Sequence, residues 1–164
     1  MRQSRLLFFF SCLLLAGCNP GGHVNTTGDN PSCSVRSVPD GDSVTVACNG
    51  QRHKVRLYCI DAPEMGQRPW GQESRAALRQ LLRRNDRVQL VIHDIDSYGR
   101  QVAEIFHRGE NVNLEMIRSG HASVYRRYCR LPAFYEAEAS ARERELGIWQ
   151  KEGLHQAPWR WRHR

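Results

Sequence analysis

From Cys33 onward the chain consists of short segments in which apolar and polar residues alternate. Alternation with a period of two is typical of a strand with one buried face. The alternating apolar residues are Val35, Val44 and Val46; Val55, Leu57 and Cys59; Val88, Leu90 and Ile92; and a run from Val102 to Phe106. Between the third and fourth strands, Trp70 to Arg84 instead carries leucines at helical spacing. Five short strands interrupted by a helix predict an α+β fold around a closed five-stranded barrel, for which the OB-fold is the candidate.

Two more helices are expected after the fifth strand, which makes about three in all. Asn111 is placed to cap a short helix that Gly120 ends. Pro132 stands at the start of the last helix, and Gly147 at its end. In this last helix Phe134, Ala137 and Ala141 share one face, and Glu138 can pair with Arg142.

Residues 1–17 have the pattern of an export signal. Two arginines precede an apolar run, Leu6 to Leu15, that is too short to span a bilayer as a mature helix. The residues before Cys18 resemble a bacterial lipobox, which predicts cleavage there and lipidation of the Cys18 thiol. An ordinary signal peptide with an incidental cysteine is the alternative. The protein is therefore expected to be exported, and either lipid-anchored in the cell envelope (the outer membrane is possible) or secreted.

The mature chain divides into three parts. Residues 18–32 are rich in Gly, Asn, Thr and Pro and are expected to form a flexible tether. Residues 33–150 hold the strands and helices and form one domain. Residues 151–164 end in alternating tryptophan and arginine. This tail could stack on bases while contacting phosphates, pack against the barrel, adsorb to an anionic membrane, or be a structural or disordered end.

Four cysteines remain after the signal and Cys18 are set aside, and in an exported chain they predict two disulfides with three possible connectivities. Cys33 and Cys48 are equidistant from the Asp40-Gly41 turn, so a hairpin there would place them opposite each other. This favours the pairs Cys33–Cys48 and Cys59–Cys129. A zinc site is the rival, but the chain has no C-x-x-C or H-E-x-x-H spacing.

The charge of the chain is moderately basic. Removal of residues 1–17 would lower the formal net charge from +7 to about +5. An excess of this size favours polyanionic partners without requiring them.

Acidic residues stand at two strand ends. Asp-Gly at Asp40 is in itself typical of a tight turn that needs a positive φ. However, Asp42 has the same parity as Val44 and Val46, so its carboxylate is expected to point toward the barrel interior at the mouth, where it needs a cation or strong donors. Asp61 ends the third strand, and Pro63 restricts the preceding Ala62 to an extended conformation. Asp42, Asp61 and the Ala62 carbonyl form an oxygen-only donor set suited to calcium.

Two arginines accompany these acids. Arg56 lies five positions before Asp61, so both can address one ligand, and a guanidinium fork can hold two phosphate oxygens. Arg100 follows a turn-like stretch that begins at Asp96 and is expected at the other rim of the barrel. The alternative for Arg56 is an ordinary solvated surface charge, and the alternative for the acid cluster at Asp61 is a strand end with ordinary surface acids.

Taken in order, these motifs resemble the staphylococcal nuclease (thermonuclease) family from Cys33 to Trp149. The matching stretches are Val38 to Val44, Val55 to Leu57, Ile60 to Glu64, Trp70-Gly71, Asp96 through Arg100, Val112-Asn113, Ala141-Arg142 and Gly147 to Trp149. The Met65 to Pro69 segment is shorter than its counterpart in the staphylococcal enzyme, which also lacks the four cysteines. Substrate affinity and base preference are therefore expected to differ.

The resemblance implies a role for each of these residues. Asp42, Asp61 and the Ala62 carbonyl match the calcium ligands; Glu64 matches the acid that activates or orients water; Arg56 and Arg100 match the phosphate-binding arginines; Asp40 matches a nearby acid that adds negative field; Tyr98 and Tyr125 match aromatics of the nucleotide site. The implied activity is calcium-dependent hydrolysis of phosphodiester bonds in DNA and RNA, as an endo- or exonuclease and a monomer. A non-catalytic nucleic-acid-binding OB-fold lipoprotein of the envelope is one alternative, and a purely structural envelope lipoprotein is another.

Overall fold

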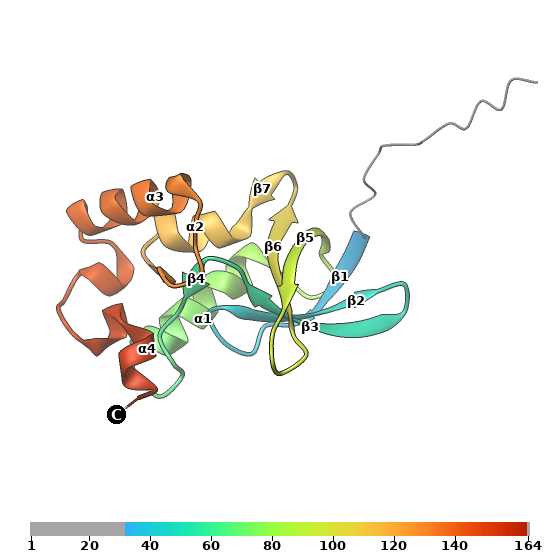
Figure 1. The fold of residues 1–164 in the computed structure, drawn as a ribbon, viewed down its shortest axis with the longest axis horizontal. Helices are drawn as coiled ribbons and strands as arrows, with labels where there is room; N and C mark the ends of the chain where they lie inside the picture. Colours follow the sequence, from blue (N-terminus) through green and yellow to red (C-terminus); the bar gives the residue numbers. More distant parts are fainter. Residues whose placement is uncertain (1–31, 164) are drawn as a thin grey trace, which may run out of the picture.

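Five strands close into a barrel in the computed structural model, which describes residues 32–163 (Figure 1). The sheet order is β3-β2-β1-β5-β6-β7, and a parallel pairing of β3 with β6 closes the ring. The strands are β1 Ser32–Ser37, β2 Ser43–Cys48, β3 Gln51–Leu57, β5 Arg87–Ile95, β6 Gln101–His107 and the short β7 Glu110–Asn111. A separate two-stranded pair joins β4 Ile60–Asp61 to β8 Ser123–Val124. The predicted five-stranded OB-fold is confirmed.

The β1–β2 hairpin places the first pair of cysteines opposite each other. Cys33 and Cys48 are register partners and are joined by a disulfide, and a second disulfide joins Cys59 to Cys129. Both predicted pairings are confirmed. The hairpin register shifts by one residue between Val35 and Ser37, which is a β-bulge.

The third strand is shorter than its alternating pattern predicted. The pattern extends to Cys59, whereas β3 ends at Leu57 and Cys59 has a positive φ of 69°. The Tyr58 amide still donates to the Ala103 carbonyl of β6, and the chain then turns away from the barrel into β4. The side-chain amide of Asn113 donates to the carbonyls of both Tyr58 and Ala103 and so holds this turn from α2. The turn matters because Asp61 follows it.

Three helices cover the barrel, as predicted: α1 Trp70–Leu81, α2 Val112–Arg118 and α3 Pro132–Glu143. Asn111 caps α2 through its side chain, and Glu138 pairs with Arg142. The prediction of Gly147 as the end of the last helix was wrong, since α3 ends at Glu143 and Gly147 begins the 3-10 turn η1 Gly147–Trp149. Gly147 is instead needed for packing, because a Cβ there would lie 2.2 Å from the Gly120 carbonyl oxygen.

The C-terminal segment folds onto the domain. After the 3-10 turn η2 Leu154–Gln156, the short helix α4 Pro158–Trp161 lies near the start of α1 (Figure 1). His155 is buried, stacks on Trp70 with ring centroids 4.3 Å apart, and contacts the Ile148 carbonyl at 2.9 Å. Of the alternatives for residues 151–164, packing against the domain is the one that the structure shows.

The predicted export signal over residues 1–17, the lipidation site Cys18 and the tether up to residue 31 lie outside the described residues. Within residues 32–163, no helix combines the length and the apolar character needed to cross a bilayer.

Candidate active site

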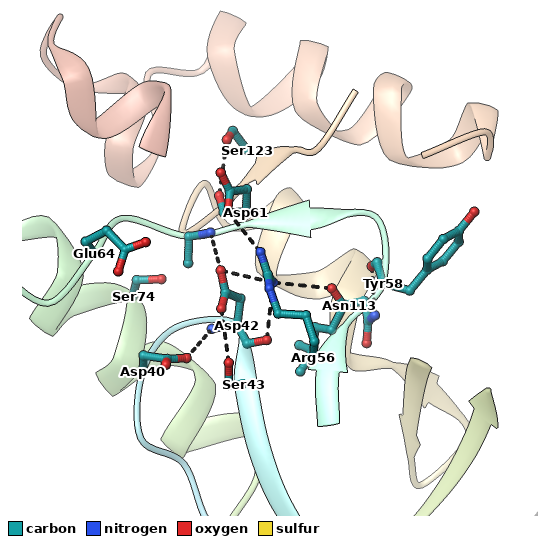
Figure 2. Close-up of polar contacts among 12 residues, drawn as sticks. Asp40, Asp42, Ser43, Arg56, Tyr58, Asp61, Glu64, Ser74, Asn113 and Ser123 are labelled. Atoms are coloured by element: carbon teal, nitrogen blue, oxygen red, sulfur yellow. Dashed lines mark hydrogen bonds and ion pairs between the residues drawn. The ribbon is translucent and has the colours of Figure 1, made fainter. Parts of the chain in front are cut away.

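Two buried carboxylates meet at one end of the barrel and share a single arginine. The Arg56 guanidinium lies 3.0 Å from Asp42 Oδ2 and 2.9 Å from Asp61 Oδ1 (Figure 2). The exposed fractions of the three side chains are 13% for Arg56, 12% for Asp42 and 0% for Asp61. The guanidinium supplies the positive charge that two buried carboxylates require.

Strand pairing brings these residues together. Arg56 of β3 is the register partner of Ser43 at the start of β2, so Asp42 lies just beyond the paired ends. The Leu57 amide donates to the Asp42 carbonyl at 2.8 Å. The turn at Cys59 leads the chain into β4, which places Asp61 beside Arg56. The Asp61 carbonyl accepts a hydrogen bond from the Ser123 hydroxyl. The expectation that Asp42 faces inward agrees with its burial.

The Asp40-Gly41-Asp42 loop holds the Asp42 carboxylate in place. Asp42 Oδ2 accepts from the Ala62 amide at 2.8 Å, and the Asp42 amide donates to Asp40 Oδ1 at 3.1 Å (Figure 2). Burial raises the pKa of Asp40, and the nearby charge of Asp42 raises it further. Burial likewise raises the pKa of Asp61, and the hydrogen bond from Arg162 opposes this.

Gly41 is required for a reason other than the one the sequence suggested. The chain does turn here between β1 and β2, but the φ of Gly41 is not in the positive range, so the interpretation that this turn needs a positive φ was wrong. A Cβ at Gly41 would instead lie 2.1 Å from Ser74 Oγ and 2.8 Å from Ala62 Cβ. The glycine therefore allows α1 and the loop that carries Asp42 to approach each other closely.

Glu64 stands at the open side of this cluster. Its side chain is 41% exposed, and its amide donates to the side-chain oxygen of the buried Gln67 at 2.8 Å. The Gln67 amide donates back to the Glu64 carbonyl at 2.8 Å, so the two residues form a closed turn. Gln67 fixes the backbone of Glu64, a role that no sequence pattern indicated.

The second predicted arginine lines a cavity that is connected to the acid pair through Arg56. A cavity of about 620 Å³ is lined by both Arg56 and Arg100. Asp96 accepts hydrogen bonds from the Arg100 backbone and from Arg100 Nε, the latter at 2.7 Å, and so fixes this arginine at the rim. Although burial acts to raise the pKa of Asp96, these hydrogen bonds lower it overall.

Aromatic rings complete the wall of this cavity. Tyr98, Tyr125 and Tyr128 line it together with the two arginines. Tyr98 is 83% exposed, and Tyr125 meets Tyr128 edge to face at 5.0 Å between centroids. Exposed aromatic faces beside guanidinium groups are suited to stacking bases and binding phosphates. The structure thus brings the predicted residues Tyr98 and Tyr125 to the same cavity as Arg56 and Arg100.

The donor atoms fit a hard cation. Asp42, Asp61 and the Ala62 carbonyl offer only oxygen, which is what calcium takes in proteins. Among residues 32–163, no three His, Cys, Asp or Glu side chains are grouped as a ready metal site. The carboxylates are instead paired with arginines, which occupy the places where positive charge is required.

One of these arginines was not predicted from the sequence. Arg162, just after α4, reaches both oxygens of Asp61 and also Glu64 Oε1, the last at 2.7 Å. Because 101 residues separate Arg162 from Asp61, no local pattern could have indicated the contact. Although burial acts to lower the pKa of Arg162, the hydrogen bonds that it donates to Asp61 and Glu64 raise it overall.

Comparison with known proteins agrees with this geometry. A family model described as staphylococcal nuclease homologue matches residues 54–151. A micrococcal nuclease of Shigella flexneri is 36% identical over 139 residues, which cover 78% of each chain. An uncharacterized endonuclease of Haemophilus influenzae is 35% identical over 119 residues, 72% of this chain and 66% of the relative. A probable staphylococcal-like nuclease of rice, CAN2, is 34% identical over 112 residues, 68% of this chain but only 30% of the relative. The chain belongs to the staphylococcal nuclease family.

Proposed function

We propose that the protein is a calcium-dependent nuclease that hydrolyses phosphodiester bonds in DNA and RNA. The observation that carries the proposal is the buried pair Asp42 and Asp61, bridged by Arg56 at the edge of a cavity that Arg100 also lines. Relatives named nuclease and endonuclease support the reaction class.

The carboxylates are suited to hold the cofactor. Calcium bound by Asp42, Asp61 and the Ala62 carbonyl would supply positive charge to a non-bridging phosphate oxygen. The two side chains are already held by the Ala62 amide and by Arg56, so little conformational freedom is lost when they bind.

Proton transfer and phosphate binding are assigned to Glu64, Arg56 and Arg100. The Glu64 side chain is exposed enough to meet water, and Gln67 fixes its backbone. Glu64 would accept a proton from the water whose oxygen attacks phosphorus, while one ester P–O bond breaks and the leaving sugar oxygen takes up a proton from solvent. Arg56 and Arg100 would bind phosphate oxygens from two sides of the cavity and neutralise the charge that develops on them. The tyrosines Tyr98 and Tyr125 would hold the neighbouring base by stacking.

The test replaces Glu64 by glutamine, which removes the base and keeps the shape. Loss of a general base lowers the rate by about 10²–10⁴-fold, so cleavage of single-stranded DNA and of RNA is expected to fall by this factor. Glu136→Gln on the exposed face of α3 is the control for the loss of one carboxylate, and it should keep full activity. Each protein is assayed with calcium and with chelator.

Three outcomes bear on the proposal. Cleavage that needs calcium and disappears only in Glu64→Gln supports it. Equal cleavage by wild type and Glu64→Gln would remove Glu64 from the reaction. Binding of single-stranded DNA with no cleavage under any condition would favour the non-catalytic barrel instead.

We also propose that the protein is exported and carries lipid on Cys18. The two disulfides support an oxidising compartment, where such bonds persist. Metabolic labelling with a fatty acid tests the anchor: wild type should incorporate label and Cys18→Ala should not. Labelling of both, or of neither, would contradict lipidation at Cys18.

A further inference from the structure

The C-terminal segment places a cation of the chain itself on Asp61, one of the proposed calcium ligands. Arg162 Nη2 lies 2.9 Å from Asp61 Oδ2 and 3.1 Å from Oδ1, while Nη1 lies 3.1 Å from Oδ1 and 2.7 Å from Glu64 Oε1. The guanidinium therefore covers both oxygens of Asp61 and bridges them to Glu64. Arg162 thus contacts Asp61, a proposed calcium ligand, and Glu64, the proposed general base, at the same time.

The segment is anchored to reach this position. His155 stacks on Trp70 and, together with the Gln156 side chain, contacts the Ile148 carbonyl. Pro158 is buried at the start of α4. Trp161 lies beside the loop that follows Glu64, since a Cβ on Gly66 would be 3.9 Å from its ring. Arg162 thus follows a folded segment that packs against Trp70 and the loop after Glu64.

A divalent cation and this guanidinium need the same oxygens. Ligation uses the carboxylate lone pairs that the Arg162 N–H groups now occupy. Calcium would also be a third cation on a carboxylate that already faces Arg56 and Arg162, and like charges repel. Arg162 also holds Glu64, so the proposed base is paired while the segment is docked. Docked Arg162 and bound calcium therefore exclude each other at Asp61.

We propose that Arg162 is an internal competitor for calcium: the C-terminal segment closes the active site in the metal-free protein, and calcium must displace it. This inference rests on the proposed function, because it concerns the calcium ligands named there. It assigns the C-terminal segment a regulatory contact. By linkage, whatever weakens docking of α4 strengthens calcium binding, and calcium weakens docking in return.

The test measures calcium binding directly in the full-length chain. Arg162→Gln removes the competing charge and is expected to lower the calcium dissociation constant by about tenfold or more, since hydrogen bonds between charged groups are lost from the competing state. Arg160→Gln is the matched control, because it removes the same charge from an exposed position on the helix that Arg162 directly follows. The calcium dissociation constant of Arg160→Gln should stay within about twofold of the wild-type value, because salt screens the effect of one surface charge. Isothermal titration calorimetry gives all three values.

A second readout follows the segment itself. Calcium should speed hydrogen exchange of the amides of residues 154–162 in wild type, because the displaced segment loses its packing. In Arg162→Gln, the same amides should already exchange faster without calcium.

The outcomes separate this inference from the proposed function. Equal calcium affinity of wild type and Arg162→Gln would overturn the competitor role and leave the calcium site intact. Lower activity of Arg162→Gln at saturating calcium, with unchanged affinity, would also overturn it and make Arg162 a substrate-binding residue. If neither protein binds calcium, both the competitor role and the calcium site are wrong.

Discussion

The Cys59–Cys129 disulfide closes a much longer loop than Cys33–Cys48, and this difference can be tested as a free energy. The sequence separations are 70 and 15 residues. In the chain-entropy model, a loop of about 70 residues stabilises the fold by about 4.4 kcal/mol at 25 °C and one of about 15 residues by about 3.0 kcal/mol. All four cysteines are buried, so replacement by alanine removes similar packing at each pair. The predicted difference between the two pairs is therefore about 1.4 kcal/mol.

The assay is urea unfolding of the full-length chain and of two double variants. Cys59→Ala/Cys129→Ala should lose about 1.4 kcal/mol more unfolding free energy than Cys33→Ala/Cys48→Ala. Equal losses of unfolding free energy, or a larger loss in Cys33→Ala/Cys48→Ala, would refute the loop-entropy reasoning. Such a result would show that local packing determines the loss of stability.

The longer disulfide should also affect the substrate cavity. The Cys59 carbonyl accepts a hydrogen bond from the Tyr125 amide at 2.8 Å, and both residues line the cavity. At a temperature where both variants stay folded, KM for single-stranded DNA should rise in the Cys59/Cys129 variant and stay near wild type in the other. An unchanged KM in both variants would show that the loop around Tyr125 does not depend on the bridge.

Two further predictions concern the loop after Glu64 and the partly buried His121. Gly71→Ala would place a Cβ 2.1 Å from the Glu64 carbonyl oxygen, so it should cost about 1–3 kcal/mol and lower activity, whereas Gly66→Ala meets only an atom of Trp161 at 3.9 Å and should be nearly neutral. Urea unfolding and cleavage assays check both, and equal effects would contradict the predicted clash. Burial lowers the pKa of His121 below its ordinary 6.5, so the unfolded chain binds more protons in acid. This contribution to stability is present above pH 6.5 and is lost as the pH falls below it. In urea unfolding at a series of pH values, His121→Gln should lose less unfolding free energy than wild type as the pH falls below 6.5. Parallel curves of unfolding free energy against pH for the two proteins would refute this prediction.

The barrel and half of the site could be predicted from the sequence because they follow from strand parity and register. Asp42 shares the parity of Val44, and that is enough to turn its side chain inward. Cys33 and Cys48 flank one turn symmetrically, so hairpin pairing alone places them opposite each other. In both cases the relevant contacts lie within one hairpin.

The features that could not be predicted from the sequence depend on packing between segments that are distant in the chain. The positive φ of Cys59 interrupts an alternating pattern that shows no break in the sequence, because Asn113 in α2 holds the turn. Gly41 is required by the approach of Ser74 in α1, which a turn motif does not reveal. Arg162 reaches Asp61 only once the whole chain between them is folded.

The two arginines on Asp61 differ in how easily the fold can release them. Arg56 is 13% exposed, belongs to a strand paired on both sides and pairs with Asp42 as well. Its removal would leave the buried Asp42 carboxylate without this counter-charge and Asp61 with Arg162 alone. The Arg162 side chain is 34% exposed and directly follows a helix of only four residues, Pro158–Trp161. A cation that enters the site must replace one of these positive charges, and the loss of Arg162 disrupts far less structure. Arg56 is therefore the fixed counter-charge of the acid pair, and Arg162 is the exchangeable one.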